Sequence, residues 1–277
     1  QRMGLEPMVI LSQAPGWAKE LIREGRTDEF FAAYSQYVTY VLNAIKRATN
    51  SSVLKPITLI QMWNEANHII DPTPAKFDYR YFEIAGRLIN DILGTPEMGG
   101  PLKLINTMAN VPFWMQAVNS WLERAGEYID VIGIDHYPGT WSPVPFVNWK
   151  PLEKLVTKVN TPGSPWYGKQ AAVLETGYST WGNVFANETW QAFFIKRALS
   201  KIRKIAEETN LGGNMPWLEA KNNKIILVTW YSLVDSKERG EGSQEGHFGI
   251  LKKNGQRKKG WLTLKEEFQK IKDIPIK

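Results

Sequence analysis

The feature that most constrains the fold is a regular alternation of short apolar runs with longer amphipathic segments. The apolar runs, which we expect to be strands, lie at residues 8–12, 57–63, 102–107, 128–134, 170–174 and 224–231. The amphipathic segments, which we expect to be helices, lie at residues 27–48, 79–93, 113–125, 152–159, 188–209 and 262–271. Continuous apolar runs are typical of parallel strands covered on both faces, so the pattern predicts an α/β fold with a parallel sheet.

Two architectures fit this alternation, a doubly wound sheet and a (β/α)8 TIM barrel. No Gly-x-Gly-x-x-Gly or Walker A pattern follows any apolar run, which argues against a nucleotide-binding sheet. Polar and aromatic residues instead gather where the runs end, and these residues are Asn64, Glu65, His136, Tyr137, Glu175 and Trp230. Because TIM barrels carry their active sites at the carboxyl ends of the strands, we expect a TIM barrel, with six βα units readable in this chain.

The composition excludes several classes of chemistry. The chain of 277 residues has no cysteine and only three histidines, which excludes thiolate chemistry and argues against a multi-histidine metal site. No apolar stretch is long enough to span a membrane. The net charge of +6 fits solvated helix faces better than a nucleic-acid surface. Twelve tryptophans are compatible with sugar binding, because flat apolar rings stack on the C–H faces of pyranoses.

Two glutamates end apolar runs, Glu65 in Trp63-Asn64-Glu65 and Glu175 in Leu174-Glu175. An ionisable side chain directly after a buried strand is costly unless it is paired or used. Either glutamate alone fits a helix cap or a local ion pair. Two carboxyl groups at the mouth of one barrel fit glycoside hydrolysis, in which one acts as general acid and the other as nucleophile or base.

These segments together resemble the clan A glycoside hydrolases, which are retaining (β/α)8 enzymes, and families 5 and 39 both fit. The segments that carry the resemblance are Trp63-Asn64-Glu65, Ile132-Gly133-Ile134-Asp135-His136-Tyr137-Pro138, Leu174-Glu175-Thr176-Gly177, Val228-Thr229-Trp230, and His247-Phe248-Gly249-Ile250-Leu251 with Asn254, Gly255 and Lys258. Their order agrees with that family from end to end.

The resemblance implies a role for each site residue. Glu65 would be the acid/base at the end of strand four, and Glu175 the nucleophile at the end of strand seven. Tyr137 would hydrogen-bond the nucleophile, Trp230 would form the floor of the sugar subsite, and Asn64 would bind the sugar 2-hydroxyl. The implied partner is a β-glycoside or β-glycan, and the chemistry requires no metal or organic cofactor.

Other side chains near the strand ends keep two interpretations. His136 is either a sugar contact or a structural histidine. Asn67 and His68 fit a loop cap better than a substrate contact. The loop tryptophans either line further subsites or, more simply, pack the loops; they are Trp141, Trp149, Trp166 and Trp181.

The match departs from the family in one respect. If residues 57–63 are strand four, then residues 8–12 are strand three, and strands one and two have no counterpart. The family's arginine at the end of strand two is then missing as well. We therefore expect residues 1–277 to form one catalytic barrel domain that starts at strand three. Three explanations stay open: the sequence lacks the first part of the natural protein, the barrel is incomplete, or a partner chain completes it. An incomplete barrel would expose strand edges, which favours self-association or a partner chain.

Two alternatives remain from the sequence. The first is a non-catalytic carbohydrate-binding barrel with the same fold and aromatic residues. The second is another barrel enzyme, such as a metal-dependent isomerase or an aldolase, but none of the expected strands ends in lysine or in a cluster of metal ligands. The sugar, the linkage and the choice between exo and endo attack stay open. The compartment also stays open, and an extracellular location is compatible with the sequence.

Overall fold

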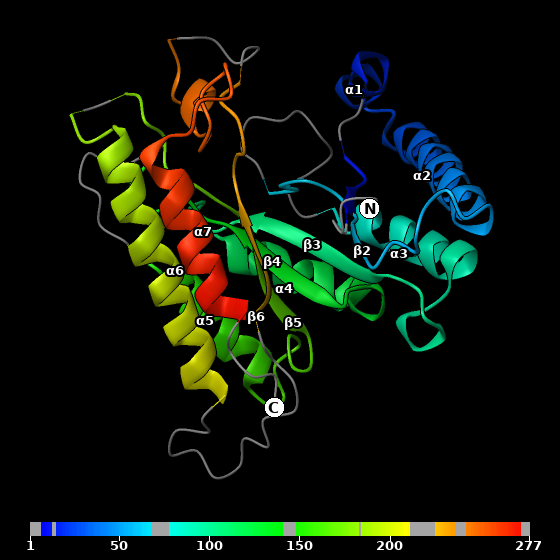
Figure 1. Ribbon diagram of the computed structural model, residues 1–277. Coiled ribbons are helices and arrows are strands. Elements are labelled where there is room, and N and C mark those ends of the chain that lie inside the picture. Colours follow the sequence, from blue (N-terminus) through cyan, green and yellow to red (C-terminus); the bar gives the residue numbers. More distant parts are fainter. Residues whose placement is uncertain are drawn as a thin grey trace. The chain divides into compact units, whose positions relative to one another are not determined.

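A computed structural model (Figure 1) describes residues 7–12, 15–67, 78–140, 148–182, 184–210, 225–236 and 242–272. The chain forms two compact units. The first comprises Gln1–Ile134 and Thr161–Gln170, and the second comprises Asp135–Asn160 and Ala171–Lys277.

Six strands lie in the described part of the chain, at or near the six predicted runs. They are β1 (Met8–Ile10), β2 (Leu59–Gln61), β3 (Leu102–Met108), β4 (Val131–Asp135), β5 (Gln170–Thr176) and β6 (Ile225–Trp230). Their hydrogen-bonded order is β1-β2-β3-β4-β5-β6, and the pairs β1–β2, β2–β3 and β5–β6 are parallel. Strand order that follows chain order, with helices between strands, confirms the predicted α/β architecture of TIM-barrel type.

The helices occupy the predicted amphipathic segments, with one addition. They are α1 (Gly16–Arg23), α2 (Thr27–Asn50), α3 (Arg80–Leu93), α4 (Trp114–Ala125), α5 (Lys150–Asn160), α6 (Glu188–Asn210) and α7 (Lys259–Lys272), with 3-10 helices η1 (Pro96–Met98), η2 (Gly126–Tyr128) and η3 (Gln244–His247). The sequence analysis missed α1. This helix has only eight residues and starts with Gly16 directly after Pro15, and both residue types argue against a helix when read in isolation.

Two strand boundaries differ from the prediction in ways that matter for the site. Strand β2 ends at Gln61, not at Trp63; the Met62 N–H still donates to the Leu104 carbonyl at 2.9 Å, and then the chain bends away. Strand β5 continues to Thr176, so Glu175 is the penultimate residue of the strand and does not follow it.

The core of the first unit is rich in aromatic rings. Trp63 lies 4.2 Å from Tyr81 of α3 and 5.3 Å from Tyr34 of α2, measured between ring centroids. The Tyr34 hydroxyl donates to the Met62 carbonyl at 2.6 Å. Helices α2 and α3 therefore fix Met62 and Trp63, the two residues that follow β2 and directly precede Asn64 and Glu65.

A buried ion pair lies near the start of β3. Lys103 is nearly fully buried in this strand, and its ammonium lies 2.8 Å from the Asp130 carboxylate. The same carboxylate accepts the Lys103 backbone N–H at 2.8 Å. A buried lysine needs such a partner because an isolated buried charge is very costly.

In the second unit, α6 and α7 run side by side (Figure 1). The side chains buried along α6 include Phe194, Ile195, Ala198 and Leu199. Gln191 is also fully buried there, and its amide donates to the carbonyl oxygens of Tyr178 and Gly249 at 2.9 and 3.1 Å. This glutamine ties α6 to the segments that follow β5 and β6.

Candidate active site

The site residues of the first unit, Asn64 and Glu65, lie in the bend after β2. Asn106 in the middle of β3 holds both of them. Its side-chain oxygen accepts the Glu65 backbone N–H at 2.7 Å, and its amide nitrogen donates to Asn64 Oδ1 at 3.1 Å. Asn64 Oδ1 accepts a second bond, from Gln61 Nε2 at 2.9 Å. Asn64 is therefore fixed through its oxygen, which leaves its amide nitrogen as the hydrogen-bond donor.

The bend itself is conformationally unusual at Glu65. Its φ of +47° lies in the left-handed region, which non-glycine residues adopt rarely and mostly where the surroundings enforce it. Asn67 helps to hold this bend in place. Its Nδ2 donates to the Met108 carbonyl at 3.1 Å, and its Oδ1 accepts the Met108 N–H at 2.9 Å. Asn67 thus fastens the loop, as expected, and His68 lies outside the described residues.

The site residues of the second unit meet at the ends of β4 and β5. The Tyr137 hydroxyl donates to Glu175 Oε2 at 2.5 Å. The backbone fixes their register, because the His136 N–H donates to the Glu175 carbonyl at 2.9 Å. Glu175 and Tyr137 are both half-buried, while the residues beside them in the chain are buried. The hydrogen bond that the resemblance implied between these two side chains is present.

Two rings that the sequence analysis did not assign to the site surround Tyr137. The Tyr231 and Phe248 ring centroids lie 6.1 and 5.4 Å from that of Tyr137, and 5.5 Å from each other. Gly177 allows this close approach, since a Cβ there would lie 2.1 Å from the Tyr231 carbonyl oxygen. Tyr231 directly follows Trp230, which ends β6. This position next to a predicted site residue was the only feature of the sequence that could have indicated Tyr231 as part of the site.

Trp230 itself packs elsewhere. Its ring lies 6.1 Å from Phe194, which is buried on α6. Tyr231 is the first residue after β6, and its ring contacts those of Tyr137 and Phe248 instead. The sugar-stacking role of Trp230 stays a prediction, and Tyr231 is a second candidate for it.

His136 is held in place by its ring. It is 6% exposed, its Nε2–H donates to the Asn148 carbonyl at 2.5 Å, and its ring packs edge-on against Trp149 at 5.2 Å. A carbonyl can only accept, so Nε2 carries the proton. Burial lowers the pKa of His136, and the bond to Asn148 acts against that shift. Its contact with a sugar stays a prediction.

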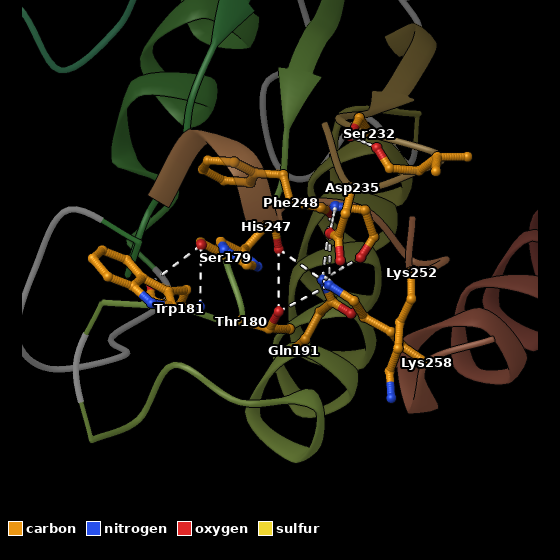
Figure 2. Close-up of polar contacts among 12 residues, drawn as sticks. Ser179, Thr180, Trp181, Gln191, Ser232, Asp235, His247, Phe248, Lys252 and Lys258 are labelled. Carbon is orange, nitrogen blue, oxygen red and sulfur yellow. Dashed lines mark hydrogen bonds and ion pairs between the residues drawn. The ribbon is translucent and has the colours of Figure 1, made fainter. Parts of the chain in front are cut away.

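A buried ion pair between Lys258 and Asp235 holds the loops of the second unit together (Figure 2). The Lys258 ammonium donates to Asp235 Oδ1 at 2.7 Å, to Thr180 Oγ1 at 2.8 Å and to the His247 carbonyl at 3.3 Å. Asp235 Oδ1 also accepts the Gly249 N–H at 3.0 Å. Burial lowers the pKa of Lys258, and the hydrogen bond to Asp235 opposes this shift. One ammonium therefore joins the segments after β5 and β6 to the start of α7.

The loop tryptophans divide by burial. Trp149 and Trp166 are buried, and Trp166 Nε1 donates to Asn119 Oδ1 at 2.5 Å, so both pack the fold. Trp181 is 41% exposed and stacks on His247 at 6.0 Å. Trp141 lies outside the described residues.

Two features are absent from the described residues. No described helix is long and apolar enough to cross a membrane. Within the same residues, no three side chains of histidine, aspartate or glutamate gather as they would around a metal ion.

Comparison with known proteins gives structural matches only. No protein-family model and no curated protein matches the sequence. A fungal β-1,4-galactanase superposes with a TM-score of 0.57 at 15% identity, covering 92% of this chain and 72% of its own. Xylanase 10B from Thermotoga maritima superposes with a TM-score of 0.56 at 14% identity, covering 94% of this chain and 72% of its own. A β-1,3-glucanase and allergen of Cryptomeria japonica pollen superposes with a TM-score of 0.57 at 12% identity, covering 90% of this chain and 82% of its own. At these identities the chain shares the fold of those enzymes.

The ion pair yields a stability prediction. Lys258→Met leaves the Asp235 carboxylate buried without its charge partner, so we expect a loss of about 3–5 kcal/mol in the free energy of unfolding. Lys258→Met combined with Asp235→Asn removes the stranded charge and keeps an acceptor for the Gly249 N–H. The double variant should lose less than the sum of the two single losses in urea unfolding. Arg23→Met, in an exposed pair with Glu20, is the control and should change little. Strictly additive losses would contradict a buried, coupled pair.

The burial of His136 predicts how stability depends on pH. Its pKa is lowered in the folded state, so below about pH 6.5 the unfolded chain binds a proton that the folded chain does not. The stability that His136 contributes should be complete above that pH and decline as the pH falls. Urea unfolding of the wild type and His136→Gln checks this, because the stability difference between them should shrink between pH 7 and pH 5. A difference that stays constant or widens would contradict it.

Proposed function

We propose that the protein is a glycoside hydrolase that cleaves β-glycosidic bonds with retention. The observation that carries the proposal is the hydrogen bond from Tyr137 to Glu175 at the carboxyl end of β5. A second glutamate, Glu65, follows β2 in a bend fixed by Asn106. The structural neighbours named as galactanase, xylanase and glucanase support this class, and the resemblance to clan A families 5 and 39 supports the retaining form.

The proposed reaction has two steps. Glu175 attacks the anomeric carbon, the bond from that carbon to the leaving oxygen breaks, and protonated Glu65 gives its proton to that oxygen. Glu65, now ionised, takes a proton from water as the water oxygen attacks the same carbon. The ester bond to Glu175 breaks, and the sugar leaves with its original anomeric configuration.

The neighbouring residues would orient these groups. Tyr137 engages one oxygen of Glu175 and thereby sets the direction of the other. Asn64, with its oxygen engaged twice, would donate its amide hydrogens to the sugar 2-hydroxyl. Trp230 or Tyr231 would stack beneath the sugar ring. Residues 1–277 would act as one catalytic domain, with β1 as the third strand of the barrel. A β-glycoside or β-glycan would be the partner, and no cofactor would take part.

The alternative is a carbohydrate-binding barrel without turnover. It rests on the same fold and aromatic residues, and it predicts sugar binding without product.

Release of the aryl group from a panel of β-linked aryl glycosides tests the proposal. The panel comprises glucoside, mannoside, xyloside, galactoside and glucuronide. We expect turnover of at least one, and Glu175→Ala should lower kcat at least about a thousandfold because the nucleophile is lost. Tyr137→Phe keeps the ring and loses one hydrogen bond to a charged group, so kcat/KM should fall about 10- to 100-fold.

Glu153→Ala is the matched control, because Glu153 lies on α5, where it pairs with Lys201. Its turnover should equal that of the wild type. Turnover that survives Glu175→Ala would refute the assignment of the nucleophile. Sugar binding without turnover of any glycoside would favour the non-catalytic barrel.

A further inference from the structure

A cavity of about 260 Å³ lies in the first unit between α1, the first half of α2 and the end of β2. Five aromatic rings line it, namely those of Trp17, Phe30, Tyr34, Tyr37 and Trp63, together with one proline and two alanines. None of these lining residues has a role in the reaction proposed above.

The walls of the cavity differ in how firmly they are held. Trp63 and Tyr34 form a fixed floor, because both rings are buried in the core and the Tyr34 hydroxyl is bonded to the Met62 carbonyl. Trp17 forms an outer wall that is 62% exposed. Ala18 and Ala33 contribute only methyl groups, so the space between floor and wall stays open. The cavity therefore combines a rigid apolar base with access from solvent.

The lining decides what chemistry the cavity can hold. Apart from the hydroxyls of Tyr34 and Tyr37 and the indole N–H groups of Trp17 and Trp63, the described residues that line it present apolar atoms. Most hydroxyl groups of a buried sugar would therefore lose hydrogen bonds to water without replacement. Burial raises the pKa of Tyr37, which keeps its phenol neutral. An apolar cavity of about 150 Å³ is enough to bind benzene. The larger volume here fits one ring or two fused rings.

The cavity is close to the proposed catalytic acid along the chain. Trp63 of the floor precedes Glu65 by two residues, so their Cα atoms lie within about 7.6 Å. In glycoside hydrolysis the general acid protonates the leaving oxygen, and the leaving group therefore lies beside it. We propose that this cavity binds a flat apolar group of one or two rings and that this group is the leaving part of a β-glycoside. The second half of that statement rests on the proposed function.

Direct binding of 4-methylumbelliferone, a fused two-ring phenol, tests the cavity without requiring catalysis. Calorimetric titration of the full chain should show saturable binding. Ala33→Phe fills the cavity and should abolish binding, whereas Ala32→Phe places the same ring at the adjacent exposed position of α2 and should not. Trp17→Ala removes the exposed wall and should weaken binding about tenfold. Tyr40→Ala, at a ring that is 72% exposed on α2 and is not among the lining residues, should leave binding unchanged.

Kinetics then separates the site from the function. For a glycoside that the protein hydrolyses, Ala33→Phe should lower kcat/KM of the 4-methylumbelliferyl compound and leave that of the methyl compound unchanged, while Ala32→Phe should affect neither. Binding equal in Ala33→Phe and Ala32→Phe would overturn the cavity assignment, whatever the activity. Competition by a free monosaccharide would overturn the apolar ligand class. Specific 4-methylumbelliferone binding with no turnover of any glycoside would support the cavity and refute its role as a leaving-group site.

Discussion

The candidate site depends on one constraint, the burial of short parallel strands up to their last residues. In β3, β4 and β5 nearly every side chain is covered, so polar groups are tolerated only where they are bonded or where a strand ends. Tyr137 and Glu175 satisfy this condition together through their hydrogen bond. Asn64 and Glu65 satisfy it through Asn106, which is itself buried in β3. The same rule that shapes the core thus positions the carboxylates.

The sequence predicted most of the architecture because hydrophobic periodicity reports directly on burial. The apolar runs became strands, the amphipathic segments became helices, and Glu175 and Tyr137 appeared at strand ends as expected. Helix α1 was not predicted because it is short and begins at Gly16 directly after Pro15, two residue types whose propensities favour a loop. The order of elements was readable, whereas exact ends such as that of β2 depended on the bend at Glu65.

The supporting contacts were not readable, because they join residues that are distant along the chain. The Asn106 side chain accepts the backbone N–H of Glu65, which lies 41 residues earlier in the chain. The sequence around Asn106 contains no pattern that predicts so distant a contact. Lys258 and Asp235 lie 23 residues apart, and as isolated charges they resemble ordinary surface residues. Trp230 ends β6 and its ring lies near Phe194, whereas Tyr231 follows the strand and its ring lies near Tyr137, so choosing between them required the contacts of each side chain. Sequence patterns locate candidate groups, and the fold decides which of them meet.

The most direct test of the central claim is to trap the covalent intermediate. A 2-deoxy-2-fluoro β-glycoside with a good leaving group, built on the sugar that the protein hydrolyses, slows both steps and lets the glycosyl-enzyme accumulate. Mass spectrometry of the peptides should then find one fluoroglycosyl group per chain, attached to Glu175 and absent from Glu175→Ala. Hydrolysis of the parent glycoside with no trapped sugar, or with the label on another residue, would contradict the account.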